Sequence, residues 1–283
     1  MIEVHVSRRG LLAAASGLAL LSPGITALAR DGGRVDLADR RQLLEAIARM
    51  RGAADDRLVI GWIIGARYAV IETRATPMFG ILAGTFARYR RLDAETFEAR
   101  TLELAFFTDP ETGAYLERWR NPVTGVTVDV PRTRMGPSRI LLTADGLKVA
   151  DPEGEAAGLE IRHRFRPPVV HQDDVWITEE IRVFGEPREA GGRPFAYNEN
   201  SSYQASLADL ADPTQVAVPV QVSFQSLVSW RPWMGFAETP GHSLACGNGR
   251  RALTVADLPA PYLALLERFY PEVLGDPLAA LGG

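Results

Sequence analysis

The segment Phe106–Val130, "FFTDPETGAYLERWRNPVTGVTVDV", contains nearly the same five-residue turn sequence twice. Asp109-Pro-Glu-Thr-Gly113 is followed twelve residues later by Asn121-Pro-Val-Thr-Gly125. An Asp or Asn side chain can accept hydrogen bonds from the backbone of a turn, and Pro presets φ to about −65°. Gly tolerates a positive φ because it has no Cβ. Each copy therefore predicts a tight turn.

The residues around the two turns predict short strands. "TLELAFFT", before the first turn, is rich in strand-forming side chains, while "AYLERW" and "VTVDV" are too short for stable helices. Strands that alternate with tight turns form a β-meander. The repeat thus points to a fold rather than to a function.

The rest of the chain extends this β-rich prediction. Apolar residues alternate with polar ones in "LVIGWIIG", "GILAGTFARYR", "DVWITEEIRVFGEP" and "QVAVPVQVSFQSLVSW", while residues 137–158 read as a looser region with a turn and a surface loop. Helical spacing occurs near the two ends only, in "VDLADRRQLLEAIARMRGA" and "ADLPAPYLALLERFYPEVL". We predict one mainly antiparallel domain of about ten strands, curled into a barrel or half-barrel of lipocalin-like architecture with N- and C-terminal helices.

The first thirty residues have a different character. Arg8-Arg9 precede a short apolar run over 11–21 and then Ala27-Leu28-Ala29. This order predicts a twin-arginine export signal over residues 1–29, cleavage near Ala29 and a mature domain over 30–283 in the periplasm or outside the cell. The run is shorter than the ~20 residues of a membrane span, so we expect no stable membrane anchor and only a transient contact with the export machinery.

The composition excludes several function classes. The chain has 283 residues and a formal net charge of −4, which argues against a nucleic-acid partner. "CGNGRRA" matches a dinucleotide-binding pattern in its letters, but only 31 residues follow Ala252 and they leave no room for a second strand–helix unit. The histidines lack the spacing of a zinc helix. We therefore predict neither a cofactor nor a metal ion.

Strand phase selects the candidate catalytic residues. In "EIRHRFR", His163 shares a face with two apolar residues and opposes three arginines, so it is expected to point inward. Such a histidine is either a core residue with satisfied hydrogen bonds or a general acid/base. As a catalyst its carboxylate partner would be Glu179 or Glu117, and Tyr203 would be a polarising donor.

The candidate ligand-binding residues come from three segments. The face of "AYLERW" that carries two aromatics and an acid could line a cavity or lie exposed at an edge strand, and the tryptophans of "WRPWM" could close the core or form an aromatic wall. A polar cluster in "YNENSSYQ" adds one residue. The predicted ligand-binding residues are Tyr115, Glu117, Trp119, Asn200, Trp230, Trp233 and Met234.

Several segments together carry a family resemblance. The segments "NPVTG", "VWITEE", "YQASLADLADP", "VSFQSLVSWRPWMG" with "PGH", and "LPAPYLALLERFYPEVL" resemble the bacterial and fungal family catalogued as domain of unknown function 1838. Its members often carry a twin-arginine signal, and the resemblance implies no catalytic residue. The positions that match its pattern are Asn121, Gly125, Tyr203, Trp230, Pro232 and Trp233.

Two functions from different classes are consistent with these observations. The first is a cofactor-independent lyase, isomerase or hydrolase that acts on a hydrophobic or aromatic small molecule by general acid/base chemistry. The second is a non-catalytic periplasmic binding protein for such a ligand. A change of His163 to Ala distinguishes them, because it would abolish turnover and spare affinity only in the enzyme.

Overall fold

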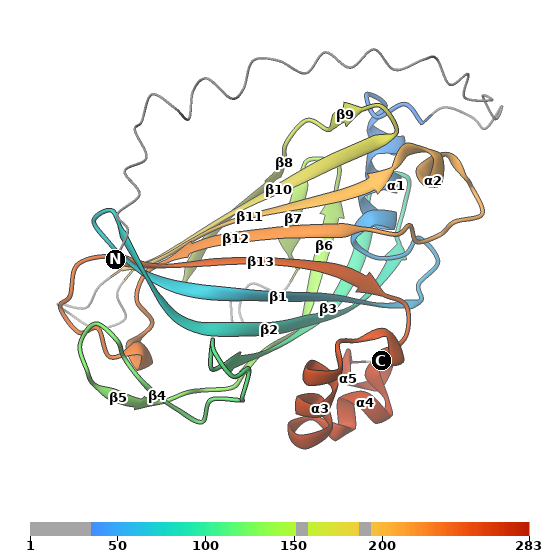
Figure 1. Ribbon diagram of the computed structural model, residues 1–283. Coiled ribbons are helices and arrows are strands. Elements are labelled where there is room, and N and C mark those ends of the chain that lie inside the picture. Colours follow the sequence, from blue (N-terminus) through green and yellow to red (C-terminus); the bar gives the residue numbers. More distant parts are fainter. Residues whose placement is uncertain (1–34, 151–157, 187–193, 283) are drawn as a thin grey trace, which may run out of the picture. The chain divides into compact units, whose positions relative to one another are not determined.

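The computed structural model describes residues 35–150, 158–186 and 194–282 (Figure 1). The predicted export signal at residues 1–29 lies outside these ranges. None of the helices within them combines the length and the apolar character that crossing a membrane requires.

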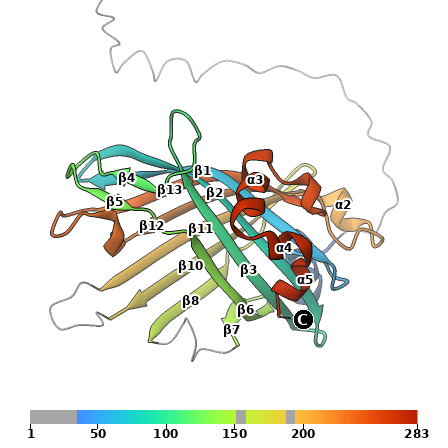
Figure 2. The ribbon, with the colours of Figure 1, turned by 90° about the horizontal axis from the view of Figure 1, so that it is seen from below.

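Eleven strands form one antiparallel sheet, and ten of them follow one another in the order β7-β6-β3-β2-β1-β13-β12-β11-β10-β8 (Figures 1 and 2). The short strand β9 pairs only with β10. The strands of the sheet are β1 (Leu58–Ile71), β2 (Arg74–Arg91), β3 (Phe97–Thr108), β6 (Thr133–Thr143), β7 (Gly146–Val149), β8 (Leu159–Phe165), β9 (Val169–His171), β10 (Asp174–Gly185), β11 (Phe195–Ser206), β12 (Gln221–Val228) and β13 (His242–Ala252). The region expected to be loose therefore contains the β6–β7 hairpin.

The sheet curls into a nearly closed barrel, which confirms the predicted fold class. Its two edge strands meet where the backbone N–H of Leu147 on β7 donates to Nδ1 of His163 on β8 at 2.9 Å. Gly146 permits this approach, because a Cβ at that position would lie 2.7 Å from the carbonyl oxygen of His163. A side chain thus joins the edges at this point of the seam.

Helix α1 (Arg40–Arg51) packs on inward-facing residues at one end of the barrel. The side chain of Asp39 caps its first turn by accepting from the backbone N–H groups of Arg41 and Gln42. The apolar face of the helix joins inward side chains of several strands in one buried cluster, which includes Leu44, Ile47, Met50, Phe97, Leu142, Val175 and Ile177. The short helix α2 (Leu207–Ala211) follows β11.

The C-terminal segment covers the outer face of β1, β2 and β3. It consists of a 3₁₀ turn (Val255–Asp257) and the helices α3 (Ala260–Phe269), α4 (Pro271–Gly275) and α5 (Pro277–Ala280). One helix was expected here, but Pro271 cannot continue α3 and starts α4 instead. Tyr262 packs with Phe106 and donates to the carbonyl oxygen of Leu104 at 2.9 Å. Both faces of β3 are consequently covered.

A separate hairpin closes the other end of the barrel. Strands β4 (Arg118–Arg120) and β5 (Thr127–Asp129) pair only with each other, so the predicted meander leaves the main sheet after β3. Both repeated turns form as predicted, with Gly113 at φ 72° and Gly125 at φ 74°. The hairpin packs against the 3₁₀ turn η1 (Pro232–Met234) in a third apolar cluster. The barrel is therefore apolar at its two ends.

Candidate functional site

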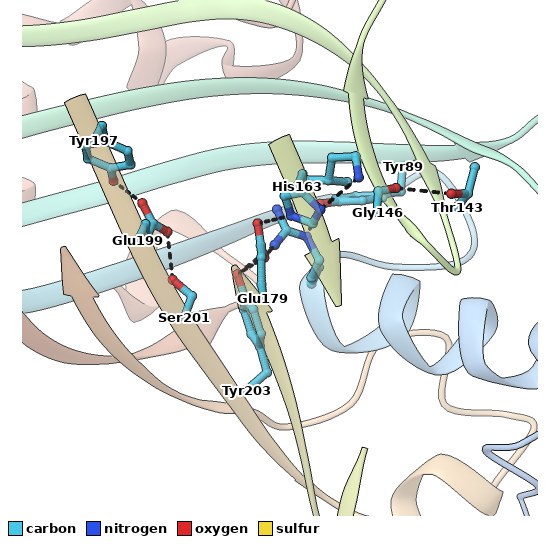
Figure 3. A network of polar contacts seen from close by, with 11 residues as sticks. Tyr89, Thr143, Gly146, His163, Glu179, Tyr197, Glu199, Ser201 and Tyr203 are labelled. Atoms are coloured by element: carbon cyan, nitrogen blue, oxygen red, sulfur yellow. Dashed lines mark hydrogen bonds and ion pairs between the residues drawn. The ribbon is translucent and has the colours of Figure 1, made fainter. Parts of the chain in front are cut away.

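A polar network lies inside the barrel next to α1 (Figure 3). Glu179 on β10 accepts a hydrogen bond from the hydroxyl of Tyr203 on β11 at 3.2 Å and forms an ion pair with Arg51 at the end of α1. Its other carboxylate oxygen lies 2.8 Å from Nε2 of His163. The structure thus brings together the three predicted catalytic residues and confirms that Glu179 contacts His163.

The contacts of His163 define its tautomer. Nδ1 accepts from the backbone N–H of Leu147, so the ring proton resides on Nε2 and is donated to Glu179. Burial and, to a smaller extent, the positive charge of Arg51 together lower the pKa of His163 to about 3. The side chain is 2% exposed. His163 is therefore neutral with both nitrogens engaged, and its predicted role in catalysis stays a prediction.

A second polar group occupies the middle of the barrel. On β11, the carboxylate of Glu199 accepts from the hydroxyls of Tyr197 and Ser201 (Figure 3). These residues alternate with outward-facing ones and share the face of Tyr203. Burial raises the pKa of Tyr197, and the negative charges of Glu199 and Glu103 raise it further.

Glu103 on β3 faces the same interior. Its neighbours Leu102 and Leu104 contact the C-terminal helices outside the barrel, so the side chain of Glu103 points to the opposite face. No hydrogen bond joins its carboxyl group to any residue that the structure describes. Burial, followed by the negative charge of Glu199, raises the pKa of Glu103 to about 7. Among the described residues, Glu103 is thus an acid without a hydrogen-bond partner, and its pKa lies near neutral pH.

The interior is not completely filled by side chains. Glu103, Tyr197 and Arg67 all point into the barrel, yet each is only half-buried. A Cβ added to Gly61, which pairs with Thr85 on the inner face of β2, would meet no atom within 4 Å. Side chains are therefore not packed tightly around these polar groups.

Two apolar side chains near the seam between the edges of the sheet are more exposed than their strand phase predicts. Ile161 on β8 and Met135 on β6 have inward positions in the strand register, beside Val183 and Glu103 respectively. They nevertheless expose 38% and 43% of their surface. These two apolar side chains are therefore exposed although their positions face inward.

The predicted cavity-lining residues of "AYLERW" are separated by the fold. Tyr115 packs against Phe269 of α3 with ring centroids 5.0 Å apart, on the outside of the barrel. Glu117 is exposed and pairs with Arg268 at 2.7 Å. Trp119 is buried in the hairpin cluster and donates its Nε1–H to the carbonyl oxygen of Met78. These three residues do not line one cavity.

The two tryptophans after β12, Trp230 and Trp233, pack against the apolar cluster at the hairpin end of the barrel. Trp230 stacks on Phe236 at 3.7 Å, and Trp233 packs between Phe79 and Phe107. Met234 is 1% exposed in the same cluster. The predicted role of these three residues in ligand binding stays a prediction. Asn200, the remaining predicted ligand-binding residue, is exposed on the outer face of β11, away from the interior.

Sequence reasoning missed Glu103, Glu199, Arg51 and Arg67. Phase could have found Glu199, because it lies four residues before Tyr203 and hence on the same face of a strand. Glu103 gave no such signal, since both faces of "TLELAFF" are apolar and both are covered in the structure.

We find no candidate metal or dinucleotide site in the part of the chain that the structure describes. No three His, Cys, Asp or Glu side chains there are grouped to hold a metal ion. The glycines of "CGNGRRA" lie within β13, where a Cβ on Gly249 would collide with the backbone of Trp62. These glycines allow β13 to lie close to β1 and do not form a phosphate-binding loop.

Comparison with known proteins places this fold in a family. The family model described as "Protein of unknown function (DUF1838)" matches residues 56–277. The chain belongs to this family. No curated protein matches it in sequence. Among the positions of the DUF1838 resemblance, Asn121, Trp230 and Trp233 hold the hairpin end together, while Tyr203 belongs to the interior network.

Proposed function

We propose that this DUF1838 protein is a cofactor-independent acid/base enzyme that transforms a small organic molecule inside the barrel. The observation that carries the proposal is the position of Glu103, an inward carboxyl group without a hydrogen-bond partner among the described residues, opposite the hydrogen-bonded Glu199. In this proposal, Glu103 exchanges the proton with the substrate.

The electrostatics of the two acids support these roles. A general acid or base works best when its pKa lies near the working pH, and the pKa of Glu103 is about 7. Pairs of carboxyl groups in unlike environments commonly divide acid and base duties between them. Glu199 accepts from Tyr197 and Ser201, whereas no described residue donates to Glu103. Glu103 can therefore turn to a ligand.

The reaction class follows from the groups present. A single carboxyl group that takes a proton from carbon and returns it elsewhere performs an isomerisation, and one that takes a proton while a leaving group departs performs a lyase reaction. Both need one substrate only. The exposed apolar residues near the seam, Met135 and Ile161, favour a partly hydrophobic or aromatic substrate.

The proposal is tested with Glu103→Gln, which keeps the size of the side chain and removes its proton chemistry. Native mass spectrometry of wild-type protein and this variant, both purified from their source cells, shows what each retains. We expect the variant to retain an unreacted substrate, and wild-type protein to convert that compound at least ~100-fold faster. Equal turnover by the two proteins would refute the role of Glu103.

A second candidate function is a non-catalytic carrier of the same kind of molecule. The observation that favours it is the locked state of His163, because the histidine predicted to do chemistry has no free nitrogen. A carrier would retain the same, chemically unchanged ligand in wild-type protein and in Glu103→Gln, and neither protein would convert it.

We also infer from Arg8-Arg9 that the protein acts outside the cytoplasm. Replacing both arginines with lysine should leave the full-length chain in the cytoplasmic fraction. If the variant is still exported and shortened, the assignment of the signal is refuted.

A further inference from the structure

Arg67 on β1 is a half-buried cation that forms no ion pair with any residue that the structure describes. It shares the inner face of β1 with Ala69, and its Nη1 donates to the hydroxyl of Ser243 at 2.8 Å. Its Nε is buried and has no hydrogen-bond partner. Nη2 forms no hydrogen bond with any described residue. The guanidinium group therefore keeps hydrogen-bonding capacity that the described residues do not use.

The charges around Arg67 make its position costly. Burial, opposed by the interaction with Tyr197 and helped by the nearby positive charge of Arg231, lowers its pKa to about 10. Arg231 lies with its guanidinium carbon 4.6 Å from the ring centre of Phe195. Neither arginine forms an ion pair with a carboxylate among the residues that the structure describes. A buried charge without a partner is strongly unfavourable, so the site lacks a negative group.

Tyr197 connects this site with the proposed catalytic acid. Its hydroxyl donates to Glu199, and it interacts electrostatically both with Glu103 and with Arg67. Arg67, Tyr197 and Glu103 hence lie near one another on the inner side of the sheet. A molecule held at Arg67 would reach from the apolar hairpin end towards Glu103.

We propose that the substrate is a small carboxylic acid whose carboxylate binds Arg67, with its hydrophobic body extending to Glu103. This inference rests on the proposed function and adds the chemical class of the substrate. A carboxylate would supply the negative charge that Arg67 and Arg231 lack, through charge-assisted hydrogen bonds. It would also place the body of the molecule near Glu103, and the positive charge of Arg67 would offset the negative charge that develops when a proton is removed from carbon.

Benzoate, its neutral counterpart benzamide, and inorganic phosphate serve as probes in calorimetry and thermal unfolding of the full chain. We expect benzoate to bind wild-type protein and raise its Tm. Benzamide and phosphate should bind about ten- to a hundred-fold more weakly, because benzamide lacks the charge for a charge-assisted hydrogen bond and phosphate is not planar. Equal binding of benzoate and benzamide, or tighter binding of phosphate, would overturn the assignment to a carboxylate.

The variant Arg67→Met removes the charge and keeps much of the volume. It should lose the response to benzoate and, without ligand, unfold at a higher temperature than wild-type protein because the unmatched charge is gone. Arg88→Met, which removes a partner of Asp56 at the protein surface, is the matched control and should bind benzoate normally. Benzoate binding that survives in folded Arg67→Met contradicts the inference.

A third variant separates this inference from the proposed function. Glu103→Gln should still bind benzoate, since the carboxylate site is intact. If Glu103→Gln has wild-type activity while benzoate binding depends on Arg67, the catalytic proposal fails and the carboxylate site stands. If Glu103→Gln is inactive and Arg67→Met binds benzoate normally, the carboxylate site fails and the catalytic proposal stands.

Discussion

The backbone N–H of Leu147 donates to Nδ1 of His163 at 2.9 Å, and this hydrogen bond joins the two edge strands of the barrel. The same ring donates from Nε2 to Glu179, which is paired with Arg51 of α1. One neutral imidazole therefore links β7, β8, β10 and, through Glu179, the helix that packs on this end of the barrel. Its protonation state is part of the fold.

His163→Ala should destabilise the protein by about 2–4 kcal/mol, because it leaves a buried backbone donor and a buried carboxylate without partners. His163→Gln should destabilise the protein by less than half as much, because the side-chain amide of the glutamine can accept a hydrogen bond from Leu147 and donate one to Glu179. Urea unfolding monitored by tryptophan fluorescence gives both values. Equal losses in the two variants would exclude the linking role.

The same pair of variants separates a structural from a catalytic histidine. If His163 only holds the seam, folded His163→Gln keeps its turnover. If it is the general acid/base that strand phase predicts, His163→Gln loses turnover as completely as His163→Ala does, because an amide does not exchange protons near neutral pH.

The contribution of His163 to stability should be lost in acid. The pKa of folded His163 is about 3, below the ordinary value of 6.5, so the unfolded chain binds a proton that the folded protein does not. The contribution of this residue is complete above about pH 6.5 and declines as the pH falls through 3. Unfolding free energies from pH 7 to 4 should decline less for His163→Gln. Parallel curves for the two proteins would contradict this origin.

Glu103 should have the opposite effect at higher pH. Its pKa is about 7 in the folded protein against an ordinary 4.5, so ionisation at neutral pH disfavours the folded state. The contribution of Glu103 to stability should therefore decline from pH 4.5 to pH 7 by up to about 3 kcal/mol. Glu103→Gln should remove this decline, which a series of denaturant titrations detects. If the unfolding free energy of Glu103→Gln depends on pH as steeply as that of wild-type protein, the carboxyl group of Glu103 is solvated in the folded state.

The two copies of the repeated turn provide a matched pair of variants. Asn121 is fully buried, accepts from the backbone of Val123 and Thr124, and donates to the carbonyl oxygen of Met234 at 2.9 Å. Asp109 makes similar bonds within its own turn, which is exposed. Asn121→Ala should cost about 2–3 kcal/mol, because it leaves the buried hairpin without its bond to the tryptophan loop.

Asp109→Ala should cost about 1 kcal/mol or less, since water replaces its hydrogen bonds. Differential scanning calorimetry of the two variants gives the comparison. A similar loss of Tm in both would show that the turn itself, and not its contact with Met234, is what stabilises this end.

The ion pair of Arg51 and Glu179 should be costly to break from one side. Arg51→Met leaves the carboxylate buried with only Tyr203 and His163, and should destabilise the protein by about 3–5 kcal/mol. The double variant Arg51→Met with Glu179→Met should recover most of that loss. A double-mutant cycle with no coupling between the two positions would refute the pairing.

Much of the fold was predictable because strand phase and turn chemistry are local. The alternation of "EIRHRFR" placed His163 inward, and Asn-Pro and Asp-Pro with a closing Gly gave the correct turns. The path of the β4–β5 hairpin was not predictable, because it depends on the burial of Trp119 against Phe79, which is distant in sequence. Pro271 divided the closing helix at a place that the sequence displays but the prediction ignored.

Some residues of the candidate site were predictable from local sequence, and others depended on the tertiary structure. His163, Glu179 and Tyr203 were found because each shares a strand face with apolar residues, and the structure brings them into contact. Glu103 was missed because the C-terminal helices cover the outer face of β3. Both faces of this strand therefore carry apolar residues, and strand phase alone cannot show which face points into the barrel. The partners of Arg67 depend on which strands become neighbours, and local sequence carries little of that information.

The sequence by itself determined the β-rich class, the turns, the terminal helices and the inward face of the strands with one apolar side, since these follow from the geometry of a few consecutive residues. The tertiary structure alone decided that the sheet nearly closes, that the hairpin and α1 occupy its ends, and that Glu103 faces Glu199 across an interior containing Arg67. Those relationships join residues far apart in the chain, and burial and electrostatics act only once the strands have come together.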